Sequence, residues 1–99
     1  MKKALWICYD IAIDDEIIEF LDSFGIIGFT RWPRLSGRGP KSGARLDNHV
    51  WPGANAAVVT VQEDELIQKL LPHLQALRRE TGPHTGLWAF TTPVLDVLD

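Results

Sequence analysis

The stretch "RLSGRGPKSGARLDNHVWPGAN", residues 34–55, separates two parts of the chain that carry similar patterns of apolar residues. It holds four basic side chains among its glycines and prolines, and it shows neither helical nor strand periodicity. A chain of 99 residues buries little more than ~60% of the surface that it exposes when unfolded, so it has little margin for an idle loop. We therefore expect a working loop, although the same charges would also serve simply to keep a flexible loop solvated.

Before this loop, the sequence predicts a strand, a helix and a second strand. Residues 4–13, "ALWICYDIAI", are rich in large and β-branched side chains, which is typical of a strand. A helix follows, with Asp14 or Asp15 as its N-cap and Gly25 at its C′ position. The stretch "IIGFTRWPRL", residues 26–35, alternates as a second strand.

After the loop, the same order of elements recurs. Residues 55–63, "NAAVVTVQE", have the β-branched centre of a strand. A second helix opens at Asp64 and ends at "TGP", and we expect a kink at Pro72 because proline cannot donate the helical hydrogen bond. Residues 86–98, "GLWAFTTPVLDVL", predict a fourth strand that bends at Pro93 and continues as an edge or interface segment.

The resulting order βαββαβ predicts a single α+β domain over residues 1–99. Two similar halves joined by a long loop indicate a ferredoxin-like sandwich, with two helices on one face of a four-stranded antiparallel sheet. The other face of that sheet also needs cover, and it has a store of aromatic area. Another copy of the same sheet is the simplest cover. The aromatic residues that we expect there are Trp6, Trp32, Trp88 and Phe90.

Charge and cysteine content narrow the class of protein. The net charge is −3, but the charged residues between Phe29 and Trp51 sum to +4, so the rest of the chain carries −7. An acidic body would repel phosphates, which argues against nucleic acid as a partner. The one cysteine, Cys8, lies in an apolar run and is expected to pack as a small buried hydrophobe. Asp10 breaks the apolar N-terminal stretch, so we expect a cytoplasmic protein with no membrane insertion.

A ferredoxin-like chain of this length, with a Gly-x-Gly-x-x-x-Gly loop between its second and third strands, resembles the PII and PII-like signalling proteins. The resemblance covers essentially the whole chain. It implies a T-loop at residues 36–53, a B-loop at residues 81–86 ("TGPHTG") and a homotrimer whose sheets pack together. In that family, an adenine nucleotide such as ATP or ADP, or another small effector, binds between subunits where the two loops meet. The T-loop then acts on a regulated target, a membrane transporter or an enzyme. Nitrogen regulation belongs to the family name and does not follow from the fold.

The residue types agree with such a site. Glycines let backbone N–H groups converge on an anion, and arginine offers a planar fork to a phosphate or carboxylate. Trp51 either anchors the base of the loop against the body or presents an aromatic anchor to a partner. The candidate effector-binding residues are Gly37, Arg38, Gly39, Lys41, Gly43, Gly82, His84 and Gly86, and the candidate partner-binding residues are Arg38, Lys41, Arg45 and Trp51.

The chain departs from the nucleotide-binding members of that family at two places. Their B-loop carries a lysine after its glycines, whereas here Gly86 is followed by Leu87 and Trp88. Their C-terminal segment supplies arginines, whereas residues 94–99 read "VLDVLD". The sequence therefore leaves open whether a nucleotide is the effector.

Two further hypotheses stay open at this point. His49 and His84 would make the chain a metal-responsive or metal-tolerance protein, similar to the CutA-like copper-tolerance proteins, if the two loops met. Isolated loop histidines are more often surface groups, so we expect no metal. A small ferredoxin-like enzyme is the other alternative, but no nucleophile is placed with a histidine and an acid. We therefore expect no enzyme activity.

Overall fold

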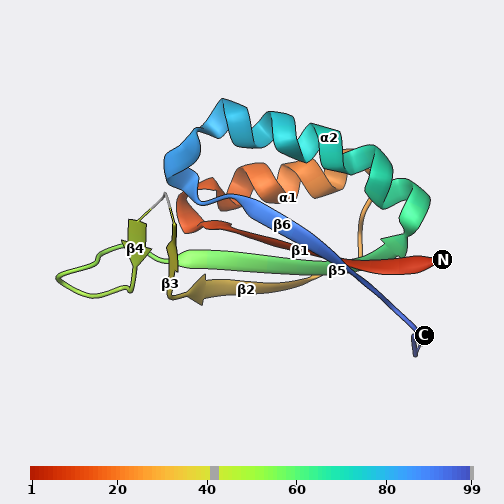
Figure 1. The fold of residues 1–99 in the computed structure, drawn as a ribbon, viewed down its shortest axis with the longest axis horizontal. Helices are drawn as coiled ribbons and strands as arrows, with labels where there is room; N and C mark the ends of the chain where they lie inside the picture. The colour runs from red at the N-terminus through yellow and green to blue at the C-terminus, as the bar shows by residue number, and fades with distance from the viewer. Residues whose placement is uncertain (41–42, 99) are drawn as a thin grey trace.

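The computed structural model describes residues 1–40 and 43–98, and its main body is a four-stranded antiparallel sheet with both helices on one face (Figure 1). The strand order is β2-β5-β1-β6. This is the predicted α+β ferredoxin-like sandwich. The elements of the body are β1 (Lys2–Asp10), α1 (Asp14–Ser23), β2 (Thr30–Leu35), β5 (Asn55–Glu63), α2 (Asp64–Thr81) and β6 (Trp88–Pro93).

Two short strands that the sequence analysis does not predict lie inside the long loop. They are β3 (Gly37–Gly39) and β4 (Gly43–Arg45), and they pair with each other in a separate two-stranded sheet. This hairpin and the turn after α2 lie at the same end of the sandwich (Figure 1).

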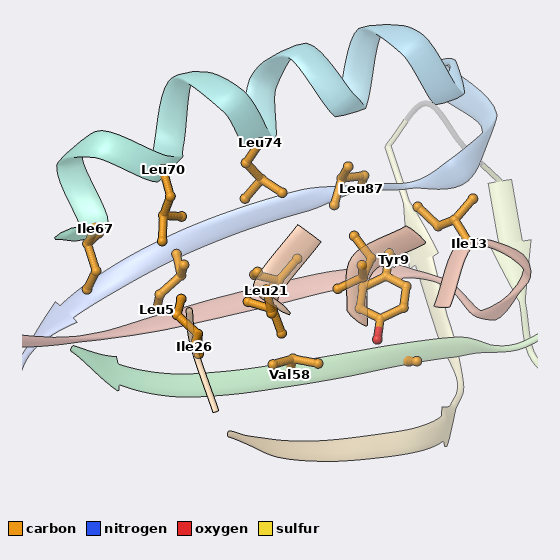
Figure 2. Close-up of a cluster of buried hydrophobic side chains, with 13 residues drawn as sticks. Leu5, Tyr9, Ile13, Leu21, Ile26, Val58, Ile67, Leu70, Leu74 and Leu87 are labelled. Atoms are coloured by element: carbon orange, nitrogen blue, oxygen red, sulfur yellow. The ribbon is translucent and has the colours of Figure 1, made fainter. Parts of the chain in front are cut away.

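The core fills the space between the helices and the sheet (Figure 2). Alternate residues of a strand point to opposite faces, so Leu5, Ile7 and Tyr9 of β1 all face the helices and are fully buried. Helix α2 covers them with Ile67 and Leu70, which are equally buried. The helix runs through Pro72 as one continuous element of 18 residues.

The ends of the first helix differ in part from prediction. β1 stops at Asp10 because the Asp10 carboxylate accepts the N–H of Ala12 at 2.9 Å and starts a short 3₁₀ turn, so the strand does not reach residue 13. Asp14 is the first residue of α1 and not its cap. Gly25 does stand at C′, with φ +73°, where its N–H donates to Asp22 and the next N–H donates to Leu21 in a Schellman cap.

The second strand begins at Thr30, later than the predicted residue 26. Ile26 is drawn into the core as part of the helix cap, since its N–H donates to the carbonyl of Leu21. The hydroxyl of Thr60 donates to the carbonyl of Gly28 at 2.7 Å, so a side chain takes the place of a ladder bond there.

The sheet face opposite the helices carries the predicted aromatic residues, and we call Trp6, Trp32, Trp88 and Phe90 the aromatic face. Trp6 stacks between Trp32 and Phe90, with ring centroids 5.8 and 5.9 Å apart, and Trp88 stacks on Phe90 at 5.3 Å. Three of these rings stay exposed, with Trp32 at 39%, Phe90 at 41% and Trp88 at 53%. Apolar area of this kind marks an interaction surface.

Cys8 also lies on this side of the sheet, in register with Trp88. It is half-buried among the strands and not part of the core, which corrects the prediction. Burial raises the pKa of the Cys8 thiol, so the thiol stays protonated near neutral pH.

Candidate functional site: a loop joined to a turn

The long loop is an ordered hairpin followed by a tight turn. Gly37 pairs with Arg45 and Gly39 with Gly43 across the hairpin. In the turn, the side-chain oxygen of Asn48 accepts the N–H groups of Val50 at 3.0 Å and Trp51 at 2.7 Å. The described parts of the loop therefore have a defined shape.

Arg45 anchors the base of this loop in the body. Its Nε donates to Asp10 Oδ2 at 2.8 Å, its Nη1 to Asn55 Oδ1 at 3.5 Å, and its Nη2 to the carbonyl oxygen of His84. Asp10 ends β1, Asn55 begins β5, and His84 belongs to the turn after α2. One guanidinium thus joins the loop, two central strands and the turn, and we call these four residues the loop–turn junction.

This position argues against a direct role of Arg45 in binding a partner, which the sequence analysis expects. Arg45 is only 8% exposed, and its fork is directed inward to three acceptors. A guanidinium held in this way is not presented to another protein. Its role is to position the loop.

Two other arginines of this region are also paired. Arg31 binds Asp14 through two bonds, Nε to Oδ1 at 2.9 Å and Nη2 to Oδ2 at 2.7 Å. Arg34 binds Asp47 in the same bidentate way, with both bonds at 2.9 Å. These arginines contribute little free positive charge to the loop surface.

The pairs also shift the pKa values of their carboxyl groups. Burial acts to raise the pKa of Asp14, but the hydrogen bonds from Arg31 and from the Tyr9 hydroxyl outweigh it and hold this pKa below its ordinary value. The hydrogen bonds from Arg34 lower the pKa of Asp47. Both carboxylates are therefore charged at neutral pH.

Arg38 differs from these arginines. It lies in β3, it is exposed, and it has no ion pair with any of the described residues. Lys41, the other cation that we expected at the effector site, lies outside the described residues. Arg38 is therefore the candidate cation whose position is known.

The turn after α2 has the backbone conformations that its glycines allow. Gly82 and Gly86 have φ values of +93° and +61° and enclose a 3₁₀ turn, Pro83–Thr85. The imidazole of His84 lies over Gly82, and a Cβ at Gly82 would stand only 2.9 Å from His84 Cε1. His84 thus gives its carbonyl oxygen to the junction while the residue itself is exposed.

Trp51 lies within the loop, and it does not belong to the core of the body. A cavity of about 490 Å³ opens within the long loop, between the β3–β4 hairpin and the segment that leads to Trp51. Arg38, Pro40, Leu46 and Trp51 are among its lining residues. Trp51 is 49% exposed there. Of its two predicted roles, the structure favours the exposed aromatic over the anchor on the body.

The histidines do not form a metal site in the part of the chain that the structure describes. His49 lies in the exposed turn 48–50 and His84 in the loop–turn junction. Neither belongs to a group of three or more histidine, cysteine, aspartate or glutamate side chains arranged to hold an ion, among residues 1–40 and 43–98.

Asp10 and Asn55 are the site residues that the sequence analysis misses. In the sequence Asp10 stands out only as a break in an apolar run, yet it is the main partner of Arg45. The sequence signal for this role is an acidic residue at the end of a predicted buried strand, in a chain that also has a basic loop. That signal does not say which of five cations it pairs with.

None of the helices among the described residues is long and apolar enough to cross a membrane. No family model matches the chain, and no curated protein sequence matches it.

Solved structures do match the fold. CPII from Thiomonas intermedia K12, described as a nitrogen regulatory PII-like protein bound to ADP, AMP and bicarbonate, is 24% identical, with a TM-score of 0.71 over 91% of this chain and 88% of that one. The apo form of CPII gives a TM-score of 0.70 at 23% identity, over 92% of this chain and 86% of that one. A protein from Thermus thermophilus, described as a putative PII-like signaling protein, gives 0.64 at 23% identity, over 92% of this chain and 84% of that one. The chain therefore has the fold of the PII-like proteins.

Proposed function

We propose that this protein is a PII-like, non-enzymatic cytoplasmic regulator that binds a small anionic effector of the adenine-nucleotide class beside the loop–turn junction. Residues 36–53 would then act on a protein target, a transporter or an enzyme. The observation that carries the proposal is the bond from Arg45 to the carbonyl oxygen of His84, because it joins the two segments between which such an effector would bind. An effector that contacts both segments would act on the loop directly.

The charges around the junction favour an anion. Arg38 stands on the hairpin next to the junction without an ion pair to any described residue, and a guanidinium suits a phosphate or a carboxylate. No cation follows Gly86, since Leu87 is buried and Trp88 belongs to the aromatic face. We therefore assign the positive charge of the site to the loop, with Lys41 as its second source. The binding of ADP and AMP by CPII makes these nucleotides the first probes.

The assembly that we propose is a homotrimer held by the aromatic face. The rings of Trp6, Trp32 and Phe90 form one stacked apolar strip across the sheet. Apolar strips of this kind are covered by a partner of the same chemistry, and another copy of this sheet supplies one. A trimer would also bring the loop of one copy near the neighbouring copy, so the effector would bind between subunits.

A thermal-shift titration tests the effector. ATP, ADP, AMP, cyclic AMP, 2-oxoglutarate and bicarbonate are titrated with and without magnesium, because a ligand that binds only the folded state raises the melting temperature by mass action. We expect a saturable rise that Arg38→Gln abolishes and that Arg79→Gln leaves intact. Arg79 is the matched control because it is an exposed arginine on α2. No rise with any of these anions, or an equal rise in both variants, would contradict the proposal.

A further inference from the structure

The segment that follows β6 leaves the body with its apolar side chains uncovered. Val94 still donates its N–H to the carbonyl oxygen of Lys2 at 3.2 Å, but Leu95 is 92% exposed and Leu98 fully exposed. Figure 1 shows this segment running past the end of the sandwich, beside the N-terminus. Burying the two leucines of this segment, Val94–Leu98, would be favourable, so the segment is a candidate for contact with another body.

A groove of matching chemistry lies between α2 and β6. It has a volume of about 220 Å³, and its apolar lining includes Leu71, Leu74 and Leu87. Arg78 also lines it, and this arginine has no ion pair among the described residues. The groove is therefore an apolar floor with one free cation.

The segment and the groove complement each other in apolar surface and in charge. The sequence Leu95-Asp96-Val97-Leu98 offers apolar side chains around one carboxylate, and the groove offers leucines around one guanidinium. Only one or two leucine side chains fit a cavity of this size. Charge complementarity would fix the register, with Asp96 against Arg78.

The segment does not reach the groove of its own chain. Trp88 lines the groove at the start of β6, and the segment departs from the other end of that strand. A strand rises about 3.3 Å per residue, so these points lie about 17 Å apart, whereas Asp96, the third residue after Pro93, extends only about 10 Å from the end of the strand. Asp96 therefore falls short of the groove of its own chain, and the groove of another copy is the one that we consider for it.

We propose that Val94–Leu98 of one copy docks in the α2–β6 groove of a neighbouring copy, with Asp96 paired to the neighbour's Arg78. In a closed ring, each copy gives one segment and receives one. This inference rests on the assembly proposed above, because it needs copies held side by side by their sheets. It adds a second contact, from a different part of the chain.

A charge swap tests the docking. The association constant is measured by sedimentation velocity for the full chain and for Arg78→Glu, Asp96→Lys and the double variant. We expect each single variant to weaken association about tenfold and the double variant to recover most of that loss, since it restores an opposite-charge pair. Arg79→Glu is the matched control because Arg79 is the next residue of the helix and does not line the groove. Single variants that behave like the control, or a double variant with no recovery, would overturn the docking.

Cross-linking gives a second measurement that does not depend on charge. In a Cys8→Ala background, one population carries Gln75→Cys in the groove and a second, of different mass, carries Val97→Cys in the segment. We expect a disulfide between the two populations after mixing, and none when Lys69→Cys replaces the groove cysteine. No disulfide in the first mixture would overturn the proposal. If the wild-type chain is a monomer, the proposed assembly fails as a whole. If the chain associates while the swap and the cross-link fail, the docking alone is wrong.

Discussion

Replacing Arg45 by methionine tests whether the loop–turn junction is a structural part of the body. Methionine keeps much of the apolar stem and removes the guanidinium from Asp10, Asn55 and the carbonyl oxygen of His84. Removing one partner of a buried ion pair costs about 3–5 kcal/mol. The side chains of Arg45 and Asp10 are 9% and 24% exposed, so water recovers part of the solvation of Asp10. We therefore expect a loss of about 2–3 kcal/mol in the free energy of unfolding.

Urea denaturation at a fixed protomer concentration is the assay, since association makes stability depend on concentration. For a domain of this size, about 1 kcal/mol corresponds to about 4–8 °C, so the melting temperature should fall by roughly 10–20 °C. Arg34→Met is the matched control, because its pair with Asp47 has side chains 61% and 43% exposed. An exposed pair of this kind contributes little to stability, because water and salt screen it. If Arg45→Met costs no more than Arg34→Met, the junction is not what holds the loop.

Three further predictions concern other parts of the fold. Arg31 holds the folded-state pKa of Asp14 below its ordinary value. The stability from this pair is therefore present above about pH 4 and is lost as the pH falls through the folded pKa. Arg31→Gln should flatten the acid limb of a curve of unfolding free energy against pH. Gly25→Ala should cost about 1–2 kcal/mol in a urea titration because φ is +73°, whereas Gly28→Ala, which meets no atom within 4 Å and has no positive φ, should not destabilise. Trp6→Ala removes the central ring of the aromatic face and should lower the mass by light scattering with an unchanged far-ultraviolet circular dichroism spectrum; an unchanged mass would contradict assembly through this face.

The body of this fold was predictable because its signals are local. Large and β-branched side chains predict a strand within residues 4–13, and the structure has β1 there, with Trp6 on the predicted aromatic face. Gly25 marks the end of α1 because few other residues adopt its backbone conformation. The predicted ends of the strands were less accurate, because Asp10 and Thr60 make side-chain hydrogen bonds that the pattern of apolar residues does not reveal.

The candidate site was harder to predict because it depends on which charges meet in space. Five cations of the loop region look equivalent in the sequence. Three of them, Arg31, Arg34 and Arg45, are bound by carboxylates, two of which come from the body far along the chain. The glycine spacing indicates a loop with special backbone conformations, but it does not indicate the hairpin β3–β4. Long-range partners of this kind leave no periodic signal.

The internal pairing of these arginines also bears on how fast a ligand arrives. An unpaired cluster of cations would create a strong positive field that attracts anions within about one Debye length, about 8 Å at physiological ionic strength. Here each of Asp10, Asp14 and Asp47 cancels one of those charges at contact distance. The field that remains near Arg38 is weaker than that of an unpaired cluster, so the association rate of an anion should change little with added salt. Selectivity would then come from the shape of the hairpin and from close contacts, and less from electrostatic steering.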